Sequence, residues 1–330
     1  MLLGISLKTQ AVFFRQMATM INAGLTANRM VVALESQSSD KLLVNILREI
    51  EPKLSAGYSL SDALSLYPDI FSEFTINMIR AGEVGGMLEV RLKDLADYLE
   101  KTYKYRMKVI SKLVYPAILF HAGIFLPPLF LLFTQGMGAY IKATLGIIIP
   151  VYALAAGVYV AIKILSGSSG VLLTIDTILL GVPILGGFIK KLAITKFIRA
   201  FADLYEAGIS LSDALSSSAK ACGNLYMANK FLSLTRTVGT AATLTQAMRG
   251  LRLFPEMVLQ MMETGEESGN VSSMLKKVNE YMETELEESS NRFLTVLPVI
   301  MLFIMGIYTG VIMFNFFKNL YSPLNELFPK

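Results

Sequence analysis

The sequence has 330 residues, of which 53% are hydrophobic and only 17% are charged, and its mean hydropathy is +0.52. This composition indicates a membrane protein. The formal net charge of +4 is modest and spread along the chain, so no nucleic-acid partner is expected. The single cysteine, Cys222, excludes an internal disulfide.

Residues 1–112 are predicted to form a water-soluble helical domain. The run FFRQMATMINAGL (Phe13–Leu25) has apolar side chains at helical spacing and reaches Gly24, which favours a left-handed C-terminal cap. Thr26 and Ser59 are predicted helix N-caps. These signals predict helices at about 13–25, 26–38, 42–54, 59–68 and 71–80, followed by a long helix from residue 87.

The long helix is predicted to enter the membrane. Residues 113–133 contain no acid or base except His121, and a helix of this length crosses a hydrocarbon core of about 30 Å. We expect His121 to be a hydrogen-bond partner between helices. The preceding stretch is rich in basic residues, namely Lys101, Lys104, Arg106, Lys108 and Lys112.

Two further apolar windows, 145–165 and 297–317, predict the second and third transmembrane helices. The link 134–144 and the tail 318–330 are expected on the far side of the membrane from the domain that precedes them.

The stretch 171–189, within the expected connector 166–196, has two interpretations. It contains Asp176, which is costly in lipid, and Pro183, which interrupts a helix. We favour an interfacial or packed helix pair broken at Pro183. A fourth membrane span is the alternative.

The chain also repeats itself. The run FIRAFADLYEAGI (Phe197–Ile209) aligns with Phe13–Leu25, and each copy leads into an apolar span that opens near a proline, Pro116 or Pro298. The aligned pairs are Phe13–Phe197, Arg15–Arg199, Ala23–Ala207, Gly24–Gly208, Leu60–Leu244, Ala63–Ala247, Gly82–Gly265, Glu83–Glu266, Gly86–Gly269, Leu92–Leu275, Lys93–Lys276, Tyr98–Tyr281 and Glu100–Glu283. Thr243 and Gln246 predict a capping box in the second copy. The pattern indicates an internal duplication, with the second soluble domain at 197–293.

The duplication bears on topology. Two copies of one domain are expected on the same side of the membrane, which requires an even number of crossings between them. Basic residues flank the first two spans on the domain side, whereas the link between these spans carries only Lys142. Since basic residues tend to stay cytoplasmic, both domains and the N-terminus are predicted to be cytoplasmic.

No enzyme, cofactor or metal site is expected. A catalytic triad or a histidine zinc site would need the only histidine, His121, inside the first span. The pairs Ser217/Lys220 and Ser273/Lys276 have the serine–lysine spacing of some acyl-transfer enzymes, but this pattern recurs by chance.

Two Gly-Glu-x-x-Gly turns precede the long helices of the two copies, and we hypothesise that they set the start of those helices. A carboxylate is favoured near a helix N-terminus, and glycine permits positive φ. The glutamates are interpreted as structural caps, with partner contact or a cation site as the alternative. The residues concerned are Gly82, Glu83, Gly86, Gly265, Glu266 and Gly269.

The repeat, these turns and the membrane-entrance motif KVISKLVYPAIL (Lys108–Leu119) resemble the inner-membrane platform family of type II secretion and type IV pilus machines. The motif places Tyr115 and Pro116 after a basic residue, Lys108, and Pro298 marks the second copy. The chain departs from the family at Lys112 and at Leu297, where a glutamate is common, so no role of that glutamate is carried over. Its start close to the first repeat is more similar to the type IVb pilus branch.

The resemblance implies two cytoplasmic bundles of about six helices each in a multi-pass protein of a bacterial inner membrane. The expected partners are a hexameric assembly ATPase, pilin or pseudopilin subunits, other inner-membrane assembly proteins and further copies of the chain. The ATPase, and not this chain, would hydrolyse ATP. A duplicated transporter permease is the alternative function, although repeats in permeases are normally embedded in the membrane.

Overall fold

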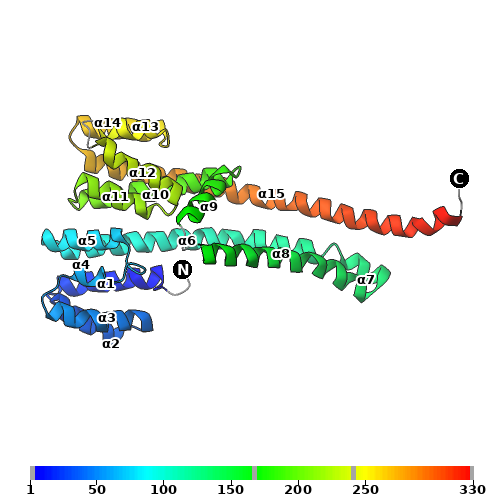
Figure 1. Ribbon diagram of the computed structural model, residues 1–330, viewed down its shortest axis with the longest axis horizontal. Helices are drawn as coiled ribbons and strands as arrows, with labels where there is room; N and C mark the ends of the chain where they lie inside the picture. The colour runs from blue at the N-terminus through cyan, green and yellow to red at the C-terminus, as the bar shows by residue number, and fades with distance from the viewer. Residues whose placement is uncertain (1–3, 166–168, 239–242, 328–330) are drawn as a thin grey trace. The chain divides into compact units, whose positions relative to one another are not determined.

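The computed structural model describes residues 4–165, 169–238 and 243–327, and all regular secondary structure in these ranges is helical (Figure 1). The predicted all-helical class is thus confirmed for the described part of the chain. The chain divides into two compact units. The first contains the described residues up to Met107 together with Asp176–Glu288, and the second contains Lys108–Ile175 together with the described residues from Ser289 onward.

The first unit begins with five short helices and the start of a long one. They are α1 (Leu7–Asn22), α2 (Ala27–Gln37), α3 (Lys41–Ser55), α4 (Leu60–Leu64), α5 (Glu73–Val84) and α6 (Leu88–Phe125). The first five begin at a residue whose side chain accepts a backbone N–H, namely Ser6, Thr26, Asp40, Ser59 and Ser72. The predicted helices of this region are present, and the caps at Thr26 and Ser59 and the positive φ of Gly24 are confirmed. Some bounds differ: the helix predicted over 13–25 spans Leu7–Asn22, and the one predicted over 59–68 ends at Leu64. We call α1–α5 with residues 88–107 the N-terminal helical set.

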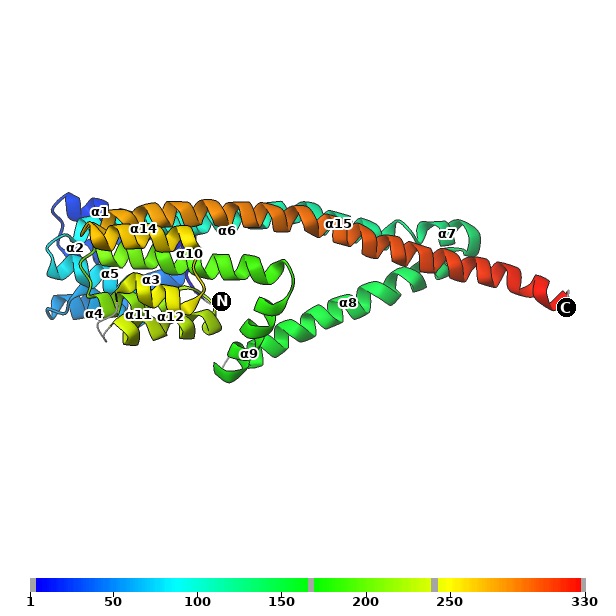
Figure 2. The same ribbon diagram turned by 90° about the horizontal axis from the view of Figure 1, so that it is seen from above.

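The rest of the first unit has the same order of helices. They are α10 (Leu185–Glu206), α11 (Leu211–Ala221), α12 (Leu225–Val238), α13 (Leu244–Leu251), α14 (Glu256–Glu267) and α15 (Val271–Leu327). The capping box predicted at Thr243 and Gln246 is present. Helices α10, α11 and α12 pack side by side (Figure 2). We call α10–α14 with residues 271–288 the C-terminal helical set; residues 239–242 of the predicted second domain lie outside the described residues.

Each set encloses an aromatic core. Phe13 and Phe71 pack with ring centroids 6.4 Å apart in the N-terminal set. Their counterparts, Phe197 and Phe254, lie 6.1 Å apart in the C-terminal set. All four rings are buried, and burying one phenylalanine contributes about 1.5–3 kcal/mol. The apolar stripe recognised in the sequence is therefore core-facing in both copies.

Polar contacts join the two sets inside the first unit. Lys220 on α11 pairs with Glu73 on α5 at 2.6 Å, and Asn77 donates to Ser217 Oγ at 2.7 Å. Arg91 on α6 donates to the carbonyl oxygen of Glu206 at 3.3 Å. The serine–lysine pair Ser217/Lys220 thus serves in packing between helices.

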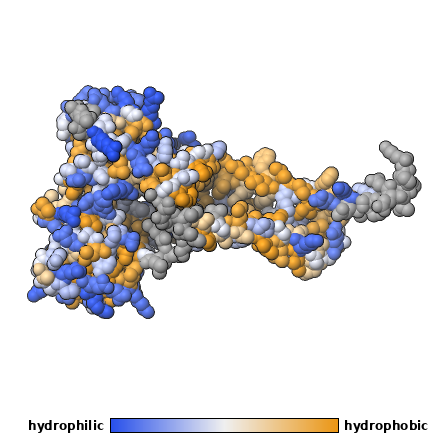
Figure 3. All heavy atoms as spheres, viewed as in Figure 1, coloured by the Kyte–Doolittle hydropathy of each residue, from blue (hydrophilic) through white to orange (hydrophobic). Residues whose placement is uncertain are grey.

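The second unit contains the apolar helices, and apolar residues cover most of its visible surface (Figure 3). Its further helices are α7 (Leu129–Gln135), α8 (Met137–Leu165) and the start of α9 (Ser169–Gly181). Three helical segments are long and apolar enough to cross a membrane, at Leu88–Gln135, Met137–Ala161 and Val271–Lys318, in agreement with the three predicted spans. The bent pair Gly170–Gly181 and Leu185–Glu206 meets the same criterion when taken together, which would make a fourth span.

Three segments differ from those expected. The helix predicted over 113–133 stops at Phe125 and resumes at Leu129, because Pro127 and Pro128 have no N–H to donate. The link predicted at 134–144 is almost entirely helical, and the chain turns at Gly136, whose φ is +85°. The predicted tail 318–330 is helical as far as Leu327, and residues 328–330 lie outside the described residues.

Close contacts hold the helices of the second unit together. His121 Nε2 on α6 hydrogen-bonds Tyr152 Oη on α8 at 2.6 Å, which confirms the helix–helix role predicted for this histidine. Its Nδ1 lies 2.7 Å from the carbonyl oxygen of Ala117. A Cβ added at Gly123 would lie 2.1 Å from Met305 Cε, so this glycine allows α6 to approach α15.

The stretch 171–189 forms two helices that meet at the predicted break. Helix α9 ends at Gly181 and α10 begins at Leu185, with an angle of 118° between them. The Asp176 carboxylate accepts the N–H of Leu225 at the start of α12. The acid that disfavoured a lipid-embedded span therefore satisfies a helix terminus in the C-terminal helical set. Residues 166–168 of the predicted connector lie outside the described residues.

One partly buried acid in the first unit was not anticipated from the sequence. Asp203 on α10 accepts no hydrogen bond from the described residues. Burial raises its pKa to about 7, the carboxylates of Asp94 and Glu206 act in the same direction, and Arg199 and Lys101 oppose them. The ionised form is thus costly in the folded state.

We expect Asp203→Asn to stabilise the protein at about pH 8 by about 1–3 kcal/mol. Between the aspartate value of 3.8 and about 7, the unfolded chain has lost the Asp203 proton while the folded chain keeps it. Wild-type stability therefore falls as pH rises through this window, and the gain of the variant shrinks toward pH ~4. Thermal unfolding of the full chain in nanodiscs, followed by circular dichroism, measures the difference.

Asp69→Asn, at an exposed aspartate, is the matched control and should show no such gain. An Asp203→Asn gain equal at both ends of the pH range would contradict the assignment.

Candidate functional site

The two Gly-Glu-x-x-Gly motifs occupy equivalent positions in the two helical sets. Gly82 and Glu83 lie in the last turn of α5, and the chain reverses after them at Gly86, whose φ is +65°. Gly265 and Glu266 lie in α14, and Gly269 has φ +66°. The turn predicted over Ala81–Gly86 therefore begins later than expected, because α5 continues to Val84.

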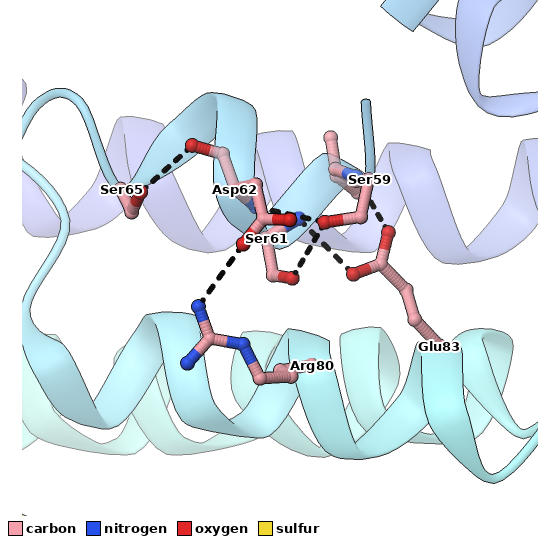
Figure 4. Close-up of polar contacts among 7 residues, drawn as sticks. Ser59, Ser61, Asp62, Ser65, Arg80 and Glu83 are labelled. Carbon is pink, nitrogen blue, oxygen red and sulfur yellow. Dashed lines mark hydrogen bonds and ion pairs between the residues drawn. The ribbon is translucent and has the colours of Figure 1, made fainter. Parts of the chain in front are cut away.

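The glutamates cap a neighbouring helix. Glu83 accepts the N–H of Leu60 at 2.6 Å and that of Ser61 at 3.1 Å, both at the start of α4 (Figure 4). Glu266 accepts the N–H groups of Leu244 and Thr245, at the start of α13, at 2.7 and 3.1 Å. We had expected these carboxylates at the start of the long helices α6 and α15. They satisfy the free amides and the positive dipole end of α4 and α13 instead.

Further contacts support the cap at α4. Ser59 Oγ accepts the N–H of Asp62 at 3.0 Å, and Arg80 from α5 pairs with the Asp62 carboxylate at 3.2 Å (Figure 4). Helix α4 has only five residues. Because so short a helix is unstable alone, it depends on the packing of its buried residues Leu60, Ala63 and Leu64, and the carboxylate of Glu83 adds to this by accepting its first amides.

The first glycine of each motif lets two helices cross closely. A Cβ at Gly82 would lie 2.9 Å from Leu88 Cα on α6, and one at Gly265 would lie 2.8 Å from Met274 Cβ on α15. Such distances are shorter than normal van der Waals contacts, so a side chain would separate the helices. Each motif thus combines a close crossing, a carboxylate cap and a left-handed turn residue.

The membrane-entrance residues belong to the second unit. Pro116 is buried inside α6, Tyr115 beside it is 61% exposed, and Lys108, about two turns earlier, is exposed. Pro298 lies inside α15. Lys112 donates a hydrogen bond to Asn291, which connects the two entrances. The structure therefore does not gather the motifs and the entrance residues into one site.

The described residues show no centre for catalysis or metal binding. No group of three or more His, Cys, Asp or Glu among them could hold a metal ion. Lys276, of the second serine–lysine pair, binds Glu206 at 2.7 Å. The arrangement consists of packed helices whose polar groups mostly satisfy one another.

Arg15 and Arg199 are aligned in the sequence repeat, but their contacts are seen only in the structure. Arg15 donates to Asp97 and, at 3.1 Å, to Glu100, so it ties α1 to α6. Its counterpart Arg199 lies 3.7 Å from Glu283, which ties α10 to α15. The sequence repeat aligned Arg15 with Arg199 and Glu100 with Glu283, but it did not indicate that each arginine contacts its glutamate.

These features define an all-helical class of protein with three helices apolar enough to cross a membrane, and the described residues contain no recognisable catalytic centre. The chain belongs to the type II secretion system protein F family, whose family model matches residues 13–135 and again residues 197–317. The resemblance stated from the sequence is confirmed.

Curated relatives cover nearly the whole chain. A type IV pilus assembly protein PilC from Pseudomonas aeruginosa is 28% identical over 96% of this chain and 89% of its own length. The protein of the same name from Thermus thermophilus is 29% identical over 98% and 84%. The type II secretion system protein F of Vibrio cholerae is 26% identical over 98% and 84%. The chain is therefore similar to members of both kinds of machine.

We expect Glu83→Gln to destabilise the N-terminal helical set by about 1–2 kcal/mol, because an amide is a weaker acceptor and brings no charge to the α4 terminus. Hydrogen exchange of the full chain should show faster exchange at Leu60 and Ser61. The matched control is Val84→Asp, at the next residue, which is 86% exposed. Unchanged protection of these two amides in Glu83→Gln would contradict the capping role.

Proposed function

We propose that this protein is the inner-membrane platform of a type IV pilus or type II secretion machine. In this role it couples a cytoplasmic assembly ATPase to the insertion or extraction of pilin-like subunits. The observation that carries the proposal is the match of the protein F family model to both halves of the chain. Relatives aligned over almost the full length are named for pilus assembly or type II secretion.

The two helical sets are proposed to be duplicated six-helix cytoplasmic domains, with boundaries near 1–112 and 197–293. The equivalent caps of Glu83 and Glu266 support the duplication, since each carboxylate accepts the first two amides of the same helix in its set. The equivalent close crossings at Gly82 and Gly265 point the same way.

We further propose that both sets and the N-terminus face the cytoplasm of a bacterium. Two crossings between the sets return the chain to the same side, and α7 and α8 are joined only through Gly136. The bond from Leu225 to Asp176 supports a packed α9 in place of a further span. The basic residues around the entrance fit the cytoplasmic side.

The long helices are the proposed route for mechanical coupling. Helix α6 includes residues of both compact units, and so does α15. A packed helix resists compression, so displacement imposed by an ATPase on a helical set reaches the apolar segments. The ATPase, pilin-like subunits, other inner-membrane assembly proteins and a second copy of the chain are the proposed partners. The chain itself needs no cofactor for this role.

The orientation can be tested by cysteine labelling in intact cells. Val84→Cys and Asn229→Cys, one exposed position in each helical set, should resist a membrane-impermeant maleimide until the inner membrane is opened. Gly138→Cys, at the start of α8, should react from outside. The native Cys222 is buried and provides the background. Labelling of Asn229→Cys from outside would overturn the topology.

The coupling can be tested by insertion between Met107 and Lys108, where α6 passes from one unit to the other. About seven glycine-rich residues should abolish pilus or pseudopilus assembly while the ATPase still co-purifies. An alanine-rich insertion of the same length adds roughly two helical turns, keeps α6 continuous and should preserve most assembly. Normal assembly with the glycine insertion would exclude the lever.

A further inference from the structure

A cavity in the first unit lies where α6, α10 and α15 meet. It encloses about 290 Å³, close to the lower end of the range of ligand pockets, which is about 300–1,000 Å³. Its walls come from residues 98–105 of α6, 192–199 of α10 and 283–287 of α15, all within the same compact unit. Tyr98, Leu192 and Leu286 contribute apolar surface to the lining. The cavity therefore has the size and the mixed lining of a site for a small ligand.

Arg199 in this lining lacks a hydrogen-bond acceptor. Its side chain is only 14% exposed, yet it donates no hydrogen bond to any residue that the structure describes. The Glu283 carboxylate lies 3.7 Å from its Nε, which is longer than a hydrogen bond, and the guanidinium packs 5.1 Å from the centroid of the Tyr98 ring. Asp203, one turn further along α10, interacts with Arg199 only through its charge and does not line the cavity. Because buried guanidinium donors are normally satisfied, the cavity lacks an acceptor that a ligand would supply.

The other helical set provides a comparison. Arg15, the repeat counterpart of Arg199, is 38% exposed and donates to both Asp97 and Glu100. Glu283, the counterpart of Glu100, instead accepts the side-chain amide of Asn279 at 3.2 Å. The chain itself thus satisfies the more exposed arginine and leaves the more buried one without an acceptor. This is the opposite of what solvation alone would favour.

Two lysines of the lining add positive charge that the chain does not neutralise. Lys101 and Lys196 form no ion pair within the described part of the chain. Burial lowers the pKa of Lys196, whose Nζ lies beside Gly223 at the turn between α11 and α12. Lys104 also lines the cavity, but it already binds Glu100 at 2.7 Å and is not counted. Three cations of the lining therefore have no hydrogen-bonded carboxylate.

The complement of these cations is an anion with several acceptor oxygens. A carboxylate brings a single charge, whereas a phosphate group brings about one to two charges and at least three acceptor oxygens. The planar fork of an arginine binds phosphate through two parallel hydrogen bonds, and a lysine adds a point charge. We propose that this cavity binds the phosphate group of a small ligand through Arg199, with Lys101 and Lys196 as the accompanying cations.

The phosphate group has two possible sources. Tyr105 precedes the apolar run that begins at residue 113 by about 12 Å of helix, and Glu287 precedes the run that begins at residue 297 by about 15 Å. In the proposed topology the cavity is then cytoplasmic and close to the headgroup layer, where anionic lipids attract basic residues. A soluble phosphate compound of the cytoplasm offers the same group. Both sources share the recognition chemistry, and experiment separates them.

Binding is measured on the full chain with soluble and lipid probes. For the soluble source, the chain in nanodiscs of zwitterionic phosphatidylcholine is titrated with inorganic phosphate and with AMP by isothermal titration calorimetry. For the lipid source, the detergent-purified chain is mixed with phosphatidylglycerol or with phosphatidylcholine, and native mass spectrometry counts the lipid molecules retained. We expect saturable binding of a soluble probe or selective retention of phosphatidylglycerol, and the probe that binds identifies the source.

Variants of the cavity test its residues, and the repeat supplies the matched control. Arg199→Gln should weaken binding roughly tenfold, because a charge-assisted contact to phosphate is lost. Lys101→Gln, at an exposed position, should weaken binding about threefold and keeps the test valid if Arg199→Gln does not fold. Arg15→Gln removes the counterpart arginine and should leave the affinity unchanged. Circular dichroism shows whether each variant keeps its helices.

Two outcomes would overturn the proposal. One is that the wild-type chain binds neither soluble probe and retains both lipids equally. The other is that Arg15→Gln and Arg199→Gln weaken binding by the same factor, which would indicate attraction to surface charge in place of a site. Neither measurement involves pilus or secretion assembly, so failure of those assays would count against the proposed function and leave the phosphate site standing.

Discussion

Two helices of this protein, α6 and α15, each contribute residues to both compact units. Helix α6 runs from Leu88 to Phe125, and α15 runs from Val271 to Leu327. Their first turns pack into the helical sets, where Leu92 and Leu275 are fully buried, and their later turns present apolar side chains outward. A helix can do this because its backbone groups are satisfied internally in either medium. The short helices around them are arranged to hold the first turns in place.

The two Gly-Glu-x-x-Gly motifs show how the short helices fix the first turns of α6 and α15. Each motif ends a short helix, and its glutamate is used at the start of a different short helix, α4 or α13. The first glycine brings the helix that carries the glutamate against the long helix, and the last glycine turns the chain into it. One sequence motif therefore connects three helices, because the same short helix carries the capping glutamate and the glycine of the close crossing.

The two helical sets share core contacts but differ in the exposure of equivalent polar side chains. Both sets contain the aromatic core and an arginine that contacts the long helix. The side chain of Arg15 is 38% exposed, whereas that of Arg199 is 14% exposed. A core position must fill a defined space, so its counterpart stays apolar and of similar size. The residue type at a surface position is constrained only by the groups that contact it. Arg199 lies against Tyr98 of α6, whereas Arg15 is paired with Asp97 and Glu100 and stays more exposed.

Local signals in the sequence determined the helices, the capping residues at Thr26, Ser59 and Thr243, the break at Pro183 and the apolar spans. These depend on spacing and on the chemistry of neighbouring residues, which a sequence displays directly. Only the tertiary structure decided which helix termini Glu83 and Glu266 cap and where Pro127 and Pro128 interrupt the first span. It also decided why the ionised form of Asp203 is costly and that Tyr98 of α6 packs against Arg199. Most of these features depend on contacts between groups that are far apart in the sequence and are brought together by packing. The spacing of residues along the chain does not reveal which distant groups are in contact.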